Sequence, residues 1–320
     1  AGEEVVARAR LPLPGGFSFD AVVRSHGWYD LPPFSYDRDK AALRTVVKSL
    51  PLTPGLSRAC PPKREARRRR QREQSEAVVF SVQGKVLVAE SATLGEGELA
   101  AIARRVFSLE LDLSEFAAAL ASEPDLARGL NRGGGRMLRA PTIFEDAVKM
   151  LLTTNCTWAA TRGMVVRLIE QSGGAAFPPP DAVARLSVRR LREKVRCGYR
   201  AQALARFARR VASGKLDLSR WEDVQVPAEE IREAILGEHG FGPYAAEGLL
   251  RILGRHGYLA IDSWIRKQYR RLHPGSKKTT DRSIARRYAC YGRFKGLALW
   301  LDMTRHWHEE HELPWPQVPG

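Results

Sequence analysis

The sequence lacks the features that mark secreted, membrane-spanning and cysteine-bound metal proteins. It has four cysteines in 320 residues, and no two lie closer than 41 residues apart, so there is no C-x-x-C pair for zinc or an iron–sulfur cluster. No stretch approaches the roughly 18 apolar residues of a membrane span, and no basic segment followed by an apolar one stands at the start. These absences predict a soluble intracellular protein with reduced, mostly buried cysteines and no membrane partner.

Negative charge is also scarce, since 36 acidic residues face 52 basic ones for a formal net charge of +16. Such a surplus favours a polyanionic partner, because binding to phosphates releases counterions. Residues 63–72 contribute seven of the basic side chains and one glutamate, yet the rest of the chain still carries +10. This run is typical of a solvated loop, with contact to a nucleic-acid backbone as the alternative. Nucleic acid is therefore the leading partner, ahead of an acidic membrane surface.

The apolar pattern changes about a third of the way along the chain. Ala77–Glu90 indicates two strands joined at a Gln83-Gly84 turn, within a β-rich domain predicted over residues 1–105. From about Gly97 onward the pattern is helical, and the fold class is therefore α+β, with an N-terminal antiparallel β-sheet domain followed by a mainly helical domain over residues 106–320.

Several helix starts can be assigned within the second domain. Thr142 and Glu145 fit a capping box, and apolar residues recur after them at helical spacing. The same spacing predicts further helices over residues 163–170, 187–195, 201–212, 227–238, 244–254, 263–272 and 294–308.

The segment HGFGPY (residues 239–244) predicts a tight hairpin between two of these helices. Gly240 and Gly242 flank Phe241, and the exposed amides of the next helix, at the positive end of its dipole, suit a phosphate group. Asp262 follows the segment by 18 residues, at the start of another predicted helix, where an N-cap role is the structural alternative. Glycines are common in helix–helix turns, so the combination with Asp262 is what indicates a functional site.

This combination resembles the helix-hairpin-helix (HhH-GPD) DNA glycosylases, which include endonuclease III, the alkylation-repair glycosylases and 8-oxoguanine DNA glycosylase. The resemblance to 8-oxoguanine DNA glycosylase and 3-methyladenine DNA glycosylase II covers about residues 106–301, and its motifs are GRMLRAP (135–141), TTN (153–155), RGMVVRL (162–168) and GYRA (198–201). It implies two helical subdomains that flank an active cleft. The implied activity is base excision repair: a monomer that flips a damaged base out of double-stranded DNA and hydrolyses its N-glycosidic bond, with no metal or cofactor.

The resemblance also implies catalytic roles. Asp262 matches the aspartate that stabilises the oxocarbenium-like sugar and orients or deprotonates the attacking water. Tyr244 stands where bifunctional members carry a Schiff-base lysine, which implies a monofunctional enzyme without lyase activity, unless another lysine such as Lys267 reaches the sugar. The cellular location expected for such an enzyme is the cytoplasm, with the nucleoid, or the nucleus.

Three further residues match those that support base flipping. Asn155, Tyr199 and Arg200 correspond to side chains that fill the gap left by the extruded base and contact its orphaned partner. The structural alternative is that Asn155 caps a turn while Tyr199 and Arg200 pack at a helix junction.

The base pocket departs from the 8-oxoguanine pattern. Leu299 and Met303 stand near where those enzymes read the lesion with a glutamine and an aromatic side chain, while Trp300 on the same helix is interpreted as core. A less polar pocket that includes Tyr244 and Trp264 resembles the alkylation-repair enzymes, which hold electron-poor bases against aromatic faces. An alkylated purine is therefore the first expectation, an oxidised purine the second, and a non-catalytic protein that binds damaged DNA the alternative from another class.

Overall fold

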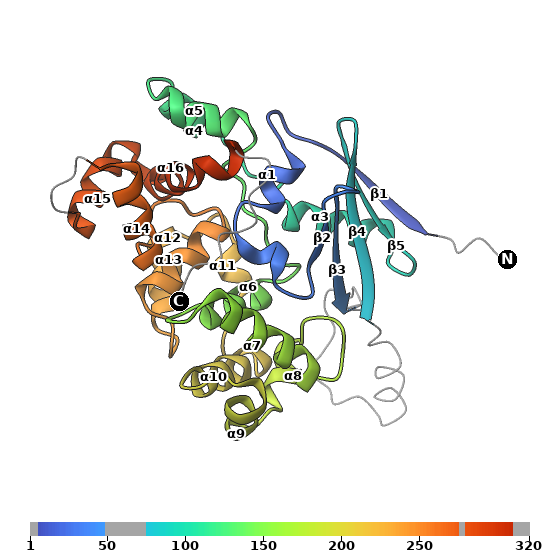
Figure 1. The fold of residues 1–320 in the computed structure, drawn as a ribbon. Coiled ribbons are helices and arrows are strands. Elements are labelled where there is room, and N and C mark those ends of the chain that lie inside the picture. Colours follow the sequence, from blue (N-terminus) through green and yellow to red (C-terminus); the bar gives the residue numbers. More distant parts are fainter. Residues whose placement is uncertain (1–5, 49–74, 275–278, 310–320) are drawn as a thin grey trace.

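The structure, a computed structural model, describes residues 6–48, 75–274 and 279–309, so the basic run at 63–72 lies outside the described residues. Five antiparallel strands form one open sheet in the order β1-β5-β4-β3-β2, on the right in Figure 1. The strands are β1 (Ala7–Pro12), β2 (Ser35–Asp37), β3 (Ala42–Lys48), β4 (Ser75–Gln83) and β5 (Val86–Ser91).

The predicted hairpin is present as β4 and β5, which pair antiparallel with Val82 opposite Leu87. The turn between them contains Gly84 at φ +62°, a conformation that glycine adopts without a steric penalty. One face of the sheet is covered by α3 (Glu96–Val106), which contacts β1 and β5 through side chains spaced at helical intervals.

Helices make up the rest of the described chain, and each helix predicted after residue 142 has a counterpart, some of them short. The helices that follow α1 (Phe19–Val23) and α3 are α4 (Ser114–Ala119), α5 (Pro124–Asn131), α6 (Ile143–Leu152), α7 (Trp158–Gln171), α8 (Pro180–Ala184), α9 (Val188–Arg190), α10 (Arg200–Ala212), α11 (Ser219–Glu222), α12 (Ala228–Leu236), α13 (Pro243–Ile252), α14 (Ser263–Leu272), α15 (Asp281–Tyr288) and α16 (Lys295–Glu309). Shorter turns are η1 (Gly27–Asp30), the π-helical turn η2 (Leu191–Val195) and η3 (Ala289–Phe294). None of the described helices is both long and apolar enough to cross a bilayer.

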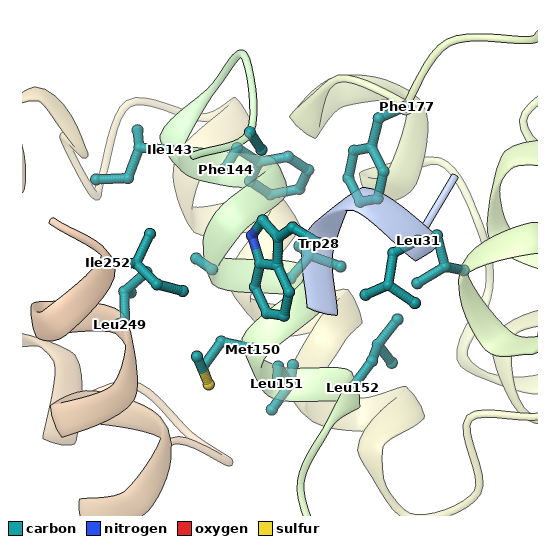
Figure 2. Packing of buried hydrophobic residues seen from close by; sticks show 14 of the residues in the cluster. Trp28, Leu31, Ile143, Phe144, Met150, Leu151, Leu152, Phe177, Leu249 and Ile252 are labelled. Carbon is teal, nitrogen blue, oxygen red and sulfur yellow. The ribbon is translucent and has the colours of Figure 1, made fainter. Parts of the chain in front are cut away.

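The central helix α6 is buried along its whole length. Thr142 caps it as predicted, because its hydroxyl oxygen accepts a hydrogen bond from the Glu145 amide at 3.2 Å. The capping box itself is wrong: the Glu145 side chain instead pairs with Lys149, with its Oε1 2.6 Å from the Lys149 Nζ atom. Figure 2 shows Trp28, from the N-terminal region, packed beside this helix near Met150 and Phe144.

The buried apolar side chains form two clusters. The first, here the sheet-side cluster, joins the sheet to α3, α6, α7, α10, α12 and α13. The second, the C-terminal cluster, is built from α4, α5, α14, α15 and α16, on the left in Figure 1. The linker from α13 to α14 passes from one cluster to the other, so residues near Asp262 lie at their boundary.

Candidate active site

A cavity of about 190 Å³ lies between the two clusters. Met150 and Ile252 line it from the sheet-side cluster, and Ile265 and Trp300 line it from the C-terminal cluster. Its polar and aromatic lining residues include His26, Trp28, Thr153, Cys156, Trp158, Tyr244, Arg251, Asp262 and Trp264. The cavity therefore combines aromatic walls with one carboxylate and one guanidinium.

Asp262 is both an N-cap and a cavity residue. Its Oδ1 accepts a hydrogen bond from the Ile265 amide at 2.7 Å, which starts α14. Two residues earlier, Ala260 has φ +50°, and its amide donates to Glu247 Oε2 at 2.9 Å, which holds this uncommon turn in place. Burial raises the pKa of Asp262, although the Ile265 amide and the nearby Arg251 oppose the shift. The carboxylate is thus positioned by the backbone and only partly stabilised in its charged form.

Tyr244, at the first turn of α13, places a phenol in the cavity. Burial raises its pKa, and the negative charge of Asp262 raises it further, so the phenol stays neutral at physiological pH. No lysine is among the residues that line the cavity, and Lys267 is exposed on α14. The cavity lining therefore provides no amine that could form a Schiff base.

Four tryptophans line the cavity, namely Trp28, Trp158, Trp264 and Trp300. Trp264 is where the sequence places it, and its ring centroid lies 5.7 Å from that of Trp300 at an interplanar angle of 46°. Several aromatic faces around one cavity suit a planar ligand.

Leu299 and Met303 do not line the cavity, which corrects their assignment to the base pocket. Both side chains are fully buried in the C-terminal cluster. Successive residues of an α-helix point about 100° apart, so α16 presents Trp300 to the cavity and turns Leu299 into the core. The interpretation of Trp300 as a core residue is corrected by the same observation.

Two buried polar residues of the cavity were missed by sequence reasoning. Arg251 is 8% exposed, and its Cζ atom lies 4.0 Å from the Trp300 ring centroid. His26 donates from Nε2 to the Leu138 carbonyl at 2.7 Å, and burial lowers its pKa to about 4, so it is neutral at physiological pH. An arginine within the apolar face of α13 was a signal that could have been noticed, whereas nothing in the sequence around His26 indicates a site.

The hairpin between α12 and α13 depends on its first glycine. Gly240 has φ +92°, and a Cβ there would lie 2.4 Å from the Ala203 Cβ. Gly242 is the exposed N-cap of α13. The side chain of Phe241 is buried, with its ring centroid 5.1 Å from that of Phe207, so it anchors the turn and does not itself reach a ligand. The backbone at Gly240 and Gly242, not the Phe241 side chain, is the accessible part of the hairpin.

Asn155 and Tyr199 come together at the rim of the cavity. Asn155 has φ +46°, and its Nδ2 donates to the Tyr199 hydroxyl at 3.3 Å. Tyr199 is 63% exposed, which is unusual for an aromatic side chain. The turn that carries Asn155 is flanked by Thr153 and Cys156, both of which line the cavity.

Arg200 does not join this exposed pair. Its side chain is 6% exposed, and its Nε donates to the Thr154 hydroxyl at 3.1 Å, while Nη2 donates to the Thr154 carbonyl. Its Cζ atom lies 4.5 Å from the Tyr199 ring centroid. Arg200 therefore supports the exposed pair from beneath and is not free to contact a base, which corrects its predicted role.

Solved structures of DNA glycosylases share this architecture. MBOgg1 in complex with a low-affinity DNA ligand aligns with a TM-score of 0.69 at 19% identity, over 95% of this chain and 97% of that one. The apo form of the Clostridium acetobutylicum 8-oxoguanine glycosylase/lyase gives 0.68 at 16% identity, over 93% and 96%. The 3-methyladenine DNA glycosylase from Archaeoglobus fulgidus gives 0.68 at 19% identity, over 93% and 98%.

No family model and no curated protein matches the chain. The structural matches nevertheless cover nearly its whole length and include enzymes named for oxidised and for alkylated purines. The chain therefore has the α+β fold of the helix-hairpin-helix (HhH-GPD) glycosylases, which confirms the fold predicted from the sequence.

Proposed function

We propose that this protein is a DNA N-glycosylase that flips a damaged base into the cavity and hydrolyses its N-glycosidic bond. The observation that carries the proposal is the position of Asp262: a partly buried carboxylate in an aromatic cavity, 18 residues after a glycine hairpin. The fold shared with DNA glycosylases supports it.

The proposed reaction uses the carboxylate as a fixed negative charge. As the C1′–N bond breaks, its electron pair leaves with the base and positive charge develops on the sugar. Asp262 stabilises that charge and accepts a proton from the water whose oxygen bonds to C1′, while the departing base takes up a proton. A fixed charge beside developing opposite charge requires no reorganisation at the moment of reaction, which makes it an effective catalytic device.

DNA binding is assigned to two exposed features near the cavity. Asn155 and Tyr199 are placed to fill the gap in the duplex, which offsets the few kcal/mol that extrusion of a base costs. The backbone amides at the start of α13, beside Gly242, are suited to a phosphate of the same strand. The partner is thus double-stranded DNA with a damaged base, bound by one copy of the chain.

Tyr244 supports a monofunctional reaction that leaves an abasic site. A neutral phenol cannot form a Schiff base, so borohydride should fail to trap a covalent enzyme–DNA adduct. Tyr244→Lys, which places an amine in the cavity, should allow trapping. Efficient trapping by the unmodified protein would contradict the monofunctional assignment.

Two substrate classes fit the cavity. An alkylated purine is favoured by the four tryptophans, because aromatic faces hold electron-poor bases. An oxidised purine is favoured by Arg251, because a buried guanidinium can donate to a carbonyl oxygen.

A lesion panel tests the proposed function. Duplexes that each contain one methylated, oxidised or deaminated base are incubated with the protein and then treated with alkali, which breaks the strand at an abasic site. Breaks at one or more lesions are expected. Binding to the same duplexes without any breaks would support the rival function, that of a non-catalytic protein that recognises damaged DNA.

A further inference from the structure

Arg251 is a buried cation whose hydrogen-bonding capacity is incompletely used. Within the described part of the chain, its Nη1 has no hydrogen-bond acceptor, and no carboxylate forms an ion pair with it. The guanidinium instead lies over the face of Trp300, in the wall of the cavity. Leaving a buried charged donor without an acceptor is costly, so such a group is a candidate to receive one from a ligand.

Arg251 is also the cation of the cavity. The other basic residue in its lining, His26, is neutral at physiological pH because burial lowers its pKa to about 4. Burial lowers the pKa of Arg251 only to about 10, with partial compensation from Tyr244 and Asp262, so the guanidinium stays charged. Arg251 and Asp262 therefore give the lining one positive and one negative charge.

These two charges act differently on two kinds of base. A cationic alkylated base would be attracted by Asp262 and repelled by Arg251, so it gains little net charge interaction for the water it loses. An uncharged base with a carbonyl oxygen offers the acceptor that the guanidinium lacks, and a hydrogen bond from a charged donor is stronger than one between neutral groups. Stacking on tryptophan is available to both.

We propose that Arg251 is a specificity-determining residue, which donates a hydrogen bond to a carbonyl oxygen of an uncharged damaged base and disfavours cationic bases. This inference rests on the proposed glycosylase function and names the substrate class of the same cavity. Undamaged guanine also has a carbonyl oxygen, but it is excluded at the flipping step, which costs least at a mismatched or damaged base.

The test compares single-turnover base release from three duplexes. One contains hypoxanthine, which is uncharged and has a carbonyl; one contains 1,N6-ethenoadenine, which is uncharged and has none; and one contains 7-methylguanine, which is cationic. In Arg251→Met, the rate on hypoxanthine relative to 7-methylguanine should fall about 10- to 100-fold, the value of a charged hydrogen bond. The rate on ethenoadenine should change least. Taking the ratio cancels the different intrinsic lability of the three bonds.

Two more variants separate recognition from support of the fold. Arg251→Lys keeps the charge and should retain the discrimination against 7-methylguanine while losing part of the rate on hypoxanthine. Arg255→Met is the matched control, because Arg255 lies one turn further along, bonds to the carbonyls of Asp223 and Val224, and does not line the cavity. It should leave all three rates within about twofold. Thermal melting of each variant reports folding, and Arg251→Gln replaces Arg251→Met if the latter does not fold.

The outcomes distinguish this inference from the proposed function. Equal loss on all three duplexes in Arg251→Met would overturn the specificity role and leave the glycosylase intact. If the unmodified protein releases no base, the proposed function fails, and dissociation constants for the same duplexes decide the inference. Weaker binding by Arg251→Met of the hypoxanthine duplex alone would sustain it, and equal weakening of all three would overturn it.

Discussion

Two buried aspartates in the same molecule have opposite environments. Asp146, on α6, is fully buried and accepts hydrogen bonds from Trp28 Nε1 and the Ala140 amide, both at 2.8 Å, and from the guanidinium of Arg105 at 3.0 Å. Asp262 accepts one backbone hydrogen bond, has a raised pKa and lines the cavity.

This difference separates a structural carboxylate from a functional one. The bonds to Asp146 join the N-terminal region to α3 and α6, so its charge is used in holding the fold together. Asp262 keeps lone pairs available and is destabilised as an anion by burial, which is the condition that favours interaction with a positive charge in the transition state. Asp146 should therefore matter for stability and Asp262 for activity.

The largest effect is expected for Asp262→Asn. Removing the charge should slow base release at least about 1000-fold, while asparagine keeps the helix cap and DNA affinity stays within about tenfold. The pKa of Asp262 is raised by folding, so the native state binds its proton more tightly and deprotonation costs stability as pH rises through the raised pKa. The melting temperature of Asp262→Asn at neutral pH should consequently be unchanged or higher. Normal turnover would refute the catalytic role.

The next effect is expected for Asp146→Asn. Asparagine can still accept from Trp28 and Ala140, but the charge that pairs with the buried guanidinium of Arg105 is lost. Breaking such a pair costs about 3 kcal/mol of unfolding free energy, here lessened because Arg105 also pairs with Glu222 at 3.0 Å. Urea denaturation measures this cost. Unaltered stability would show that the hydrogen bonds to Asp146 are not structural.

A smaller effect is expected from pH. The active form of Asp262 is the carboxylate, so base release should fall as pH decreases, with a midpoint above the value of about 3.9 that is usual for aspartate. Single-turnover rates measured on hypoxanthine duplexes between pH 4 and neutrality, as roughly spaced by the usual range of carboxyl titration, would report this midpoint. A midpoint at or below the usual value would contradict the proposed environment of Asp262.

The smallest effect is expected for Trp28→Phe, because Trp28 belongs to both environments. Phenylalanine loses the hydrogen bond to Asp146, worth about 1 kcal/mol, and keeps an aromatic face in the cavity. Stability and base release should therefore both change modestly. A large loss of activity with normal stability would show that the indole contacts the base more specifically than by stacking.

The main features of the fold were predictable from local patterns. The β4–β5 hairpin, α6 and the hairpin before α13 each follow from residues within one short segment. Asp262 could be selected because the glycine turn and the helix start stand at a recognisable distance from each other. The division into domains at residue 105 stays a prediction.

The composition of the cavity was less predictable, because residues distant in sequence form it. His26 and Trp28 lie more than 200 residues before Asp262 and have no local motif. The error between Leu299 and Trp300 concerns the rotation of α16, which is set by packing against α5 and α14 and follows an irregular turn in which Gly292 has φ +51°. Helical periodicity gives the face of a helix but not which neighbour covers it.

The contrast between the two aspartates is tested most directly by one measurement: the single-turnover rate of base release at neutral pH for Asp262→Asn and Asp146→Asn, each expressed per folded molecule. The folded fraction of Asp146→Asn should keep its rate within about tenfold of the unmodified protein, while Asp262→Asn should fall by about 1000-fold or more. Equal losses in the two variants, or a greater loss in Asp146→Asn, would contradict the assignment of catalysis to Asp262.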